Sequence, residues 1–309
     1  GDIMAIIEYS MLTLMYLVMG LTAFIFIPRA QTCANRISAV LTTTPEFAHS
    51  VVKSASGKNR KSPAHTKIEF KDVSFRYADA EEAVLHDIDF AVNKGETTAI
   101  IGSTGSGKST IASLIMRFFD IENGSILVDG KDVRGYSQEE LREKVGYVPQ
   151  KAFLFSGTIA DNLRHGKKNA TEEEMYHALR IAQIDDFVEK QGLDYRVSQG
   201  GNNFSGGQKQ RLSIARAIIK KPDIYIFDDS FSALDFKTDA KLRAALKKEV
   251  GNSAVIIVAQ RISTILDADQ IIVLDEGRIV GKGKHNELMK NCTVYQQIAH
   301  SQLSEEELA

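Results

Sequence analysis

Hydrophobic residues dominate the start of the chain, and they fall there without the alternation of a strand. The run from Ile3 to Ile27 is interrupted only by Glu8 and ends at Pro28 and Arg29. At about 1.5 Å per residue, a helix of this length spans a hydrocarbon core of roughly 30 Å. The pattern favours a transmembrane helix over a buried core helix. A signal peptide is disfavoured because no basic segment precedes the run and no small-residue cleavage site follows it.

Polar and basic residues follow the apolar run. Arg29, Arg36 and the later lysines place the C-terminal side in the cytoplasm by the positive-inside rule. Helical spacing continues to residue 41, and the Ser-, Lys- and Gly-rich stretch 42–66 is expected to be a linker, with contact to anionic lipid as the less favoured interpretation. Because the chain begins without Met and has a lone span, we expect it to be the C-terminal part of a longer membrane protein.

Beyond the linker, apolar runs predict an α/β domain. Residues 67–77 alternate as a half-buried strand does, and residues 84–92 do so less regularly, which suggests an antiparallel edge. Continuous apolar runs separated by helical segments then predict a mostly parallel sheet covered on both faces. These runs are Thr98–Ile101, Ile126–Val128, Val145–Val148, Ile224–Phe227, Val255–Val258 and Ile271–Leu274.

Composition says little about the fold but restricts the binding partners that the chain is expected to have. The 309 residues are 43% hydrophobic and 25% charged, which is ordinary for a folded protein. A net charge of −2 gives no reason to expect a nucleic acid partner. Cys33 and Cys292 lie far apart without metal-ligand spacing, so neither a disulfide framework nor a zinc site is predicted.

A glycine-rich turn follows the strand at residues 98–101 and fits the pattern G-x-x-x-x-G-K-[ST]. Backbone N–H groups of such a turn wrap phosphate oxygens, and the helix after it points its positive dipole end at the same anion. Lys108 is expected to contact the β- and γ-phosphates, and Ser109 to hold Mg²⁺. Asp228 ends an apolar strand, so it is expected at the same sheet edge as a direct or indirect Mg²⁺ ligand. The expected nucleotide-binding residues of the turn are Gly102, Ser103, Thr104, Gly105, Ser106, Gly107, Lys108, Ser109 and Thr110.

A second candidate anion site opens the amphipathic helix that begins near residue 206. Two glycines and a serine at a helix start leave backbone N–H groups free for an anion. Alone, this pattern is only a turn signal. The residues concerned are Phe204, Ser205, Gly206, Gly207 and Gln208.

Together these motifs resemble those of ATP-binding cassette (ABC) proteins. Residues 204–208 are similar to the family signature Leu-Ser-Gly-Gly-Gln, with Phe at the first position, and further motifs occur in the family's order. They are the A-loop aromatic residue Tyr77, the Q-loop residue Gln150 and the D-loop Ser232–Asp235. The resemblance covers residues 67–301, with a helical subdomain at about 151–221 and a tail at 302–309. The segment 1–41 resembles the last transmembrane helix of a type IV exporter.

The resemblance implies a role for each motif. In this family two cassettes dimerise head to tail, and each ATP lies between one chain's phosphate loop and the other chain's signature. Tyr77 is expected to stack on adenine, Gln150 to sense Mg²⁺ or the attacking water, and Asp235 to lie across the dimer interface. The signature residues 204–208 are expected to serve the nucleotide of the partner. ATP and Mg²⁺ are the implied cofactors.

Two positions depart from the family pattern. Asp229 replaces the catalytic Glu, and a displacement of about 1 Å in a catalytic group lowers a rate on the order of a hundredfold. Gln260 replaces the switch His, and a neutral amide cannot acquire imidazolium charge. Hydrolysis of ATP bound at this chain's phosphate loop is therefore expected to be slow. The catalytic positions concerned are Asp229, Gln260 and Gln150. Residues 197–201 also differ from the family's Val-Gly-Glu-Arg-Gly run, which is expected to alter communication with the transmembrane loops.

These features resemble the degenerate-site subunit of heterodimeric bacterial multidrug exporters in the cell membrane. The implied partners are a catalytically complete second half-transporter, membrane lipid and a small amphipathic substrate, with no nucleic acid. A homodimeric exporter of drugs, lipids or peptides is the alternative. A non-transporting cassette regulator or DNA-repair ATPase is disfavoured by the apolar helix fused ahead of the cassette. Glu8 is a further candidate for a substrate cavity, although it lies within two turns of the expected outer end.

Overall fold

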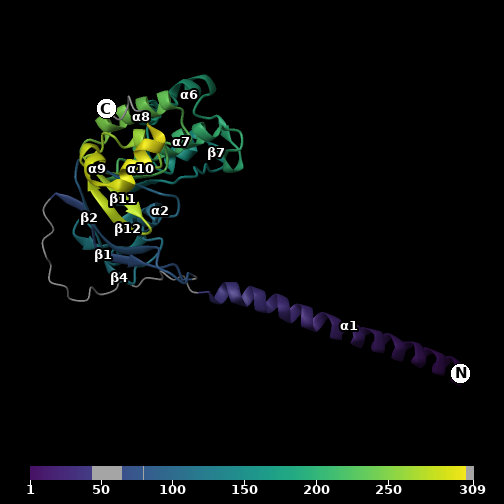
Figure 1. Cartoon of the computed structure of the whole chain (residues 1–309). Coiled ribbons are helices and arrows are strands. Elements are labelled where there is room, and N and C mark those ends of the chain that lie inside the picture. The colour runs from purple at the N-terminus through teal and green to yellow at the C-terminus, as the bar shows by residue number, and fades with distance from the viewer. Residues whose placement is uncertain (44–64, 79, 304–309) are drawn as a thin grey trace. The chain divides into compact units, whose positions relative to one another are not determined.

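The computed structural model describes residues 1–43, 65–78 and 80–303 of the chain (Figure 1). The chain divides into two units, residues 1–50 and 51–309. The expected linker at 42–66 lies almost entirely outside the described residues, as does the expected tail beyond Leu303.

The first unit is the helix α1 (Asp2–Thr42), which is 41 residues long and continues through Pro28. Its most apolar stretch has a mean hydropathy of 2.1, and none of its residues is buried within the unit. Its length and composition are those of a helix that can cross a membrane.

The second unit contains a mixed sheet and an antiparallel sheet. The mixed sheet has six strands in the order β12-β11-β3-β10-β9-β6, all parallel except for β12 at the edge. Its strands are β3 (Thr97–Gly102), β6 (Val145–Val148), β9 (Ile224–Asp228), β10 (Ala254–Val258), β11 (Gln270–Asp275) and β12 (Arg278–Gly283). The antiparallel sheet has the order β2-β1-β4-β5. Its strands are β1 (Thr66–Phe75), β2 (Leu85–Asn93), β4 (Asn123–Val128) and β5 (Lys131–Asp132).

The predicted α/β class, with a mostly parallel sheet and an antiparallel part, is confirmed. One strand assignment was wrong, because residues 126–128 do not belong to the parallel sheet. They end β4, where Ile126 pairs with Phe70 of β1 in antiparallel register. Burial alternates along β4, as in a strand with one face on the core. Three consecutive apolar residues carry too little periodicity to distinguish this case from a strand buried on both faces.

Helices cover the sheets and form a helical region after β6. They are α2 (Lys108–Ile115), α3 (Gln138–Lys144), α4 (Ile159–Arg164), α5 (Glu172–Ile181), α6 (Asp185–Gln191), α7 (Gly206–Lys220), α8 (Phe236–Glu249), α9 (His285–Asn291) and α10 (Thr293–Gln302). Short 3₁₀ turns lie at η1 (Val133–Gly135), η2 (Gln199–Gly201) and η3 (Ile262–Thr264), and the ribbon β7 (Gly157–Thr158) pairs with β8 (Arg196–Val197). Capping boxes fix the starts of α3, α4 and α5 at Ser137, Thr158 and Thr171.

Two hydrophobic cores lie on opposite faces of the mixed sheet. Ile100 of β3 belongs to the core that includes α2 and the antiparallel sheet, where Phe70 and Phe90 stack with ring centroids 4.5 Å apart. Its neighbours Ala99 and Ile101 belong to the core shared with α7, α8 and α10. Alternate residues of β3 therefore pack into the two different cores. Helix α2 lies between the two sheets.

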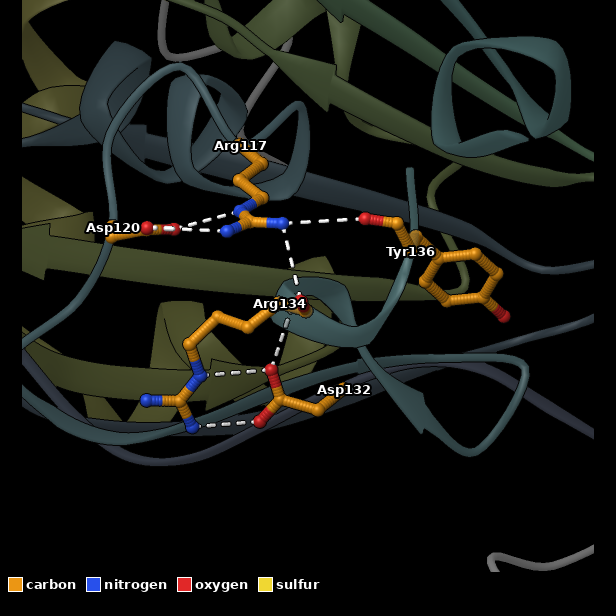
Figure 2. Close-up of polar contacts among 5 residues, drawn as sticks. All are labelled: Arg117, Asp120, Asp132, Arg134 and Tyr136. Atoms are coloured by element: carbon orange, nitrogen blue, oxygen red, sulfur yellow. Dashed lines mark hydrogen bonds and ion pairs between the residues drawn. The ribbon is translucent and has the colours of Figure 1, made fainter. Parts of the chain in front are cut away.

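The end of α2 is fastened by a buried arginine (Figure 2). The Arg117 guanidinium donates to Asp120 at 2.8 Å and to the backbone oxygens of Arg134 and Tyr136 at 3.2 and 3.3 Å. A second pair, Arg134 with Asp132, lies beside it. Arg117 is 6% exposed and has a φ of 51°, so the chain leaves α2 in a left-handed conformation held by these bonds.

Replacing this arginine is expected to loosen α2. Arg117→Ala removes the donor from two carbonyl groups and from Asp120, so we expect the free energy of unfolding to fall by about 2 to 4 kcal/mol. Urea unfolding of the chain in detergent, followed by circular dichroism, measures the change. The matched control is Arg142→Ala, since the Arg142 side chain is exposed and, in the described part of the chain, donates only to Gln138 along α3. Equal midpoints for the two variants would contradict the fastening role.

Candidate functional site

Parallel pairing brings four strand ends to one edge of the mixed sheet. In the register, Val258 of β10 lies beside Asp228 of β9 and Ile100 of β3, and Val148 of β6 lies beside Phe227. Loops that leave these ends therefore start side by side. The carboxyl edge of such a sheet is where ligands of α/β proteins bind.

The glycine-rich turn begins at the end of β3 and leads into α2. Gly105 and Gly107 have φ of 85° and 96°, values that glycine adopts at little energetic cost. A Cβ on Gly102 would lie 2.1 Å from the backbone oxygen of Leu274, and one on Gly107 would lie 2.5 Å from Leu85. The turn is thus held closely by β11 and by β2. No side chain caps the start of α2, so its first N–H groups are available to an anion.

Lys108 folds back over this turn. Its ammonium group donates to the backbone oxygens of Gly102 and Ser103 at 2.9 and 2.6 Å. Burial lowers the pKa of Lys108, while the charges of Asp229 and Asp228 oppose that change. The side chain therefore stands at the centre of the turn, where it can contact a phosphate.

Asp228 faces the start of α2 from the end of β9. Its carboxylate accepts from the Ser109 hydroxyl at 2.8 Å and from the Tyr147 hydroxyl at 3.2 Å. Burial raises the pKa of Asp228, and these two hydrogen bonds act against the rise. Two oxygen ligands, from Ser109 and Asp228, fit Mg²⁺, which takes one or two protein oxygens together with substrate phosphates. Gln150, whose amide nitrogen donates to the adjacent Asp229, carries a further candidate oxygen ligand. In the described part of the chain, no group of three or more His, Cys, Asp and Glu side chains could hold a metal alone.

Asp229 joins the Q-loop residue to the switch-loop residue. Gln150 Nε2 and Gln260 Nε2 each donate to the same oxygen, Asp229 Oδ2, at 2.9 Å. Asp229 is 8% exposed, and its φ of 45° is a conformation that Asp tolerates better than most residues do. The three predicted catalytic residues therefore form one hydrogen-bonded group beside Asp228.

The switch loop is also held from the C-terminal helix. Gln302 Nε2, at the end of α10, donates to the backbone oxygen of Gln260 at 2.8 Å, and the Ile262 N–H donates to Gln302 Oε1 at 2.9 Å. One amide thus bonds to the backbone on both sides of Arg261. No sequence motif predicts this role for Gln302.

Tyr77 contacts the first turn of α2 through Thr110. Its hydroxyl lies 3.1 Å from Thr110 Oγ1, and its ring meets Phe119 and Phe75 edge to face, with centroids 5.0 and 4.8 Å apart. The ring is half-buried and anchored, which suits a stacking role. Phe119 is a neighbour that the sequence analysis missed.

The signature residues 204–208 form their own local structure. Ser205 caps α7 in a capping box with Gln208, and a Cβ on Gly206 would meet no atom within 4 Å. Phe204 is 6% exposed and packs against Phe187 and Tyr195, so its ring belongs to the core of the helical region. Among the described residues, no hydrogen bond or ion pair joins this segment to the phosphate loop.

The D-loop lies next to the signature. A Cβ on Gly207 would lie 3.3 Å from the backbone oxygen of Ala233. Asp235 caps α8 by accepting from the Thr238 N–H at 3.0 Å, and this bonding lowers the pKa of Asp235. The structure thus forms two groups, the phosphate loop with Asp228, Asp229, Gln150 and Gln260, and the signature with the D-loop.

A protein-family profile described as ABC transporter matches residues 85–232, which include the phosphate loop, the signature and both aspartates. The chain contains an ABC transporter ATP-binding domain. It is 47% identical over 308 residues to an uncharacterised ABC transporter ATP-binding protein of Mycobacterium tuberculosis, covering 98% of this chain and 52% of that protein. It is 38% identical over 279 residues to the ATP-dependent lipid A-core flippase of Haemophilus influenzae, covering 89% of this chain and 46% of the flippase.

A solved structure of a bacterial Atm1-family ABC exporter with ATP bound matches with a TM-score of 0.81 and 35% identity, over 90% of this chain and 48% of that chain. The ABC domain is therefore homologous to those of ABC exporter half-transporters. The chain spans about half the length of the relatives it matches.

Tyr147 is a residue of the ABC domain that the sequence analysis missed. Its hydroxyl donates to Asp228, although 81 residues separate them, because β6 pairs directly with β9. An alternative signal was present, since Tyr147 precedes Gln150 by three residues on a strand that ends at the same sheet edge.

Removing the Tyr147 hydroxyl is expected to change how the binding of ATP with Mg²⁺ depends on pH. A metal needs the ionised form of Asp228, so Mg²⁺-dependent ATP binding weakens as the pH falls toward the raised pKa of Asp228. Tyr147→Phe deletes a hydrogen bond to the ionised form, which raises this pKa further and moves the acid limb up by about 0.5 to 1 pH unit. Titration with a fluorescent ATP analogue across pH measures the shift. Tyr225→Phe, on β9 itself, is the control and should leave the limb in place.

Proposed function

We propose that this chain is part of an ABC exporter subunit in the cell membrane, which couples ATP binding and hydrolysis to the export of small amphipathic compounds. The ABC domain lies on the cytoplasmic side, as Arg29 and Arg36 after the apolar run indicate. Support comes from the candidate span in α1 and from exporter relatives of the ABC domain. ATP binds at the phosphate loop, with Ser109, Asp228 and Gln150 as the residues that hold Mg²⁺.

The geometry of Asp229 supports slow hydrolysis of ATP bound at this chain's own phosphate loop. A carboxylate that orients water needs an oxygen at the reacting phosphate. In the described part of the chain only Oδ1 of Asp229 is left for this role, because Oδ2 accepts from both Gln150 and Gln260. Asp229 is also one methylene shorter than Glu, so its oxygens end closer to the backbone. Gln260 can donate to a phosphate but brings no positive charge to the transition state. The observation that carries the proposal is this shared acceptor.

The signature supports a role toward a second subunit. Gly206 begins α7 in open space, so none of the described residues requires glycine at that position. Close approach by a ligand is the usual reason for a glycine at such a place. We infer that residues 205–208 contact ATP bound to a catalytically complete partner, while the buried Phe204 ring supports them from the core. The assembly is then a heterodimer with unequal sites.

Restoring both residues is expected to speed hydrolysis at this chain's own site. Asp229→Glu with Gln260→His returns the longer carboxylate and a group that can carry charge, so we expect a gain of at least about tenfold at this site. The measurement is vanadate trapping of photolabelled ATP in the full heterodimer, assigned to each chain by mass. Asp275→Glu, at the end of β11, is a matched strand-end control.

Two outcomes would contradict the slow-site proposal. In one, the unmodified assembly traps nucleotide equally on both chains. In the other, this chain purified alone as a homodimer hydrolyses ATP as fast as the mixed assembly, which would favour the homodimeric alternative.

Gly206 tests the proposed contact with the partner. Gly206→Ala fits this chain and adds helix propensity, so the thermal stability of the subunit should stay equal or rise slightly. The added methyl group approaches the partner's nucleotide, and we expect ATP turnover by the heterodimer to fall at least about tenfold. Gly251→Ala, whose Cβ would meet only ordinary contacts, is the control. Normal turnover in Gly206→Ala would exclude close contact at this residue.

A further inference from the structure

Two adjacent phenylalanines follow helix α2 and remain well exposed. Phe118 and Phe119 are 38% and 39% exposed, and neither belongs to the two hydrophobic cores. The Phe118 N–H donates to the Ser113 oxygen at 2.9 Å, and the preceding N–H, of Arg117, donates to the Leu114 oxygen at 3.0 Å. This pair of bonds is a Schellman motif, in which Arg117 adopts the left-handed conformation that glycine usually supplies. The end of α2 therefore places the two rings, although burial does not.

The two phenylalanine rings contact different parts of the nucleotide site. Phe118 meets Tyr147 edge to face with centroids 5.9 Å apart, and Tyr147 donates to Asp228, the expected Mg²⁺ ligand. Phe119 meets Tyr77, the residue expected to stack on adenine, with centroids 5.0 Å apart and ring planes at 88°. Neighbouring residues of the same type and nearly equal exposure are thus assigned to the metal side and to the adenine side.

Tyr77 is held at three points. Its hydroxyl lies 3.1 Å from the hydroxyl oxygen of Thr110 on the first turn of α2. Its ring meets Phe75 with centroids 4.8 Å apart and Phe119 with centroids 5.0 Å apart. The centroids of Phe75 and Phe119 are 5.8 Å from each other, so the three centroids form a nearly equilateral triangle. Both phenylalanines therefore lie toward one side of Tyr77, and at least one face of its ring has no aromatic neighbour among the described residues.

Phe119 differs from Phe75 in what its ring contributes. Phe75 is 3% exposed and packs in the core with the antiparallel sheet, so its contact with Tyr77 also serves the fold. A side chain that stays 39% exposed gains less from the hydrophobic effect. Edge-to-face packing fixes the angle between two aromatic rings, and stacking on a base requires one ring face to be presented. The contact of Phe119 with Tyr77 is therefore better explained by the orientation of Tyr77 than by stability of the core.

We propose that Phe119 is a positioning residue for adenine, which holds the Tyr77 ring so that its open face meets the base of ATP. Phe119 acts through Tyr77. A ring that is already oriented before ATP arrives loses less conformational entropy on binding, and this is the physical source of the gain in affinity. The inference rests on the ATP site proposed above, and it assigns part of the affinity for the base to a residue outside the phosphate loop.

The test compares ATP with ribose triphosphate, which keeps the sugar and the phosphates but lacks the base. In the full transporter in lipid nanodiscs, each ligand with Mg²⁺ competes with an azido analogue of ATP for photolabelling of this chain, which is identified by mass. We expect Phe119→Ala to weaken ATP binding about three- to tenfold and to leave ribose triphosphate binding unchanged. Phe119→Tyr keeps the ring and should retain most of the affinity for ATP. The matched control is Phe118→Ala, for which any loss should be equal for the two ligands.

A double-variant cycle distinguishes positioning from direct contact with the base. Tyr77→Ala removes the stacking ring, so adding Phe119→Ala to it should cause no further loss of ATP affinity. The role of Phe119 would be overturned by an unchanged preference for ATP in Phe119→Ala, by equal losses for both ligands, or by additive losses in the double variant. A matching loss of preference in Phe118→Ala would also overturn it. A wild type that binds neither ligand would overturn the proposed ATP site itself.

Discussion

Parallel pairing of β3, β10, β9 and β6 is the constraint on which the site depends. It places the ends of four strands, separated by up to 156 residues in the chain, at one edge of the sheet. The phosphate loop, Asp228, Asp229, Gln150 and Gln260 follow these ends directly. A shift in register of one residue would turn Asp228, the last residue of β9, to the opposite face of the sheet. The hydrophobic cores on the two faces of the sheet fix this register, and they therefore also fix the positions from which the site residues start.

The phosphate loop depends on both sheets. The backbone of β11 and the side chain of Leu85 on β2 leave no room for a Cβ at Gly102 and Gly107. Arg117 then fixes the end of α2 against the segment that follows β4. The antiparallel sheet thus acts as more than a cover, because it determines the path by which the chain enters and leaves the nucleotide loop.

The parts of the site that could be predicted from the sequence were those with local signals. The phosphate loop combines a spaced motif with a strand before it and a helix after it, and Asp228 ends an apolar strand. Residues 126–128 were assigned to the wrong sheet because a short apolar run does not specify its pairing partner. Tyr147 and Gln302 were missed because their contacts join residues 81 and 42 positions apart. The one local signal, the position of Tyr147 three residues before Gln150, does not specify Asp228 as its partner. The shared acceptor at Asp229 likewise depends on three loops meeting at one point.

The amide of Gln302 gives the C-terminal helix an influence on chemistry at the sheet edge. It bonds to the backbone before and after Arg261, so the conformation presented by Gln260 depends on where α10 ends. Positions 260 and 302 are then energetically coupled, and replacements at the two positions should not add independently. The residue type at the switch position and the length of the final helix therefore act together on the geometry around Asp229.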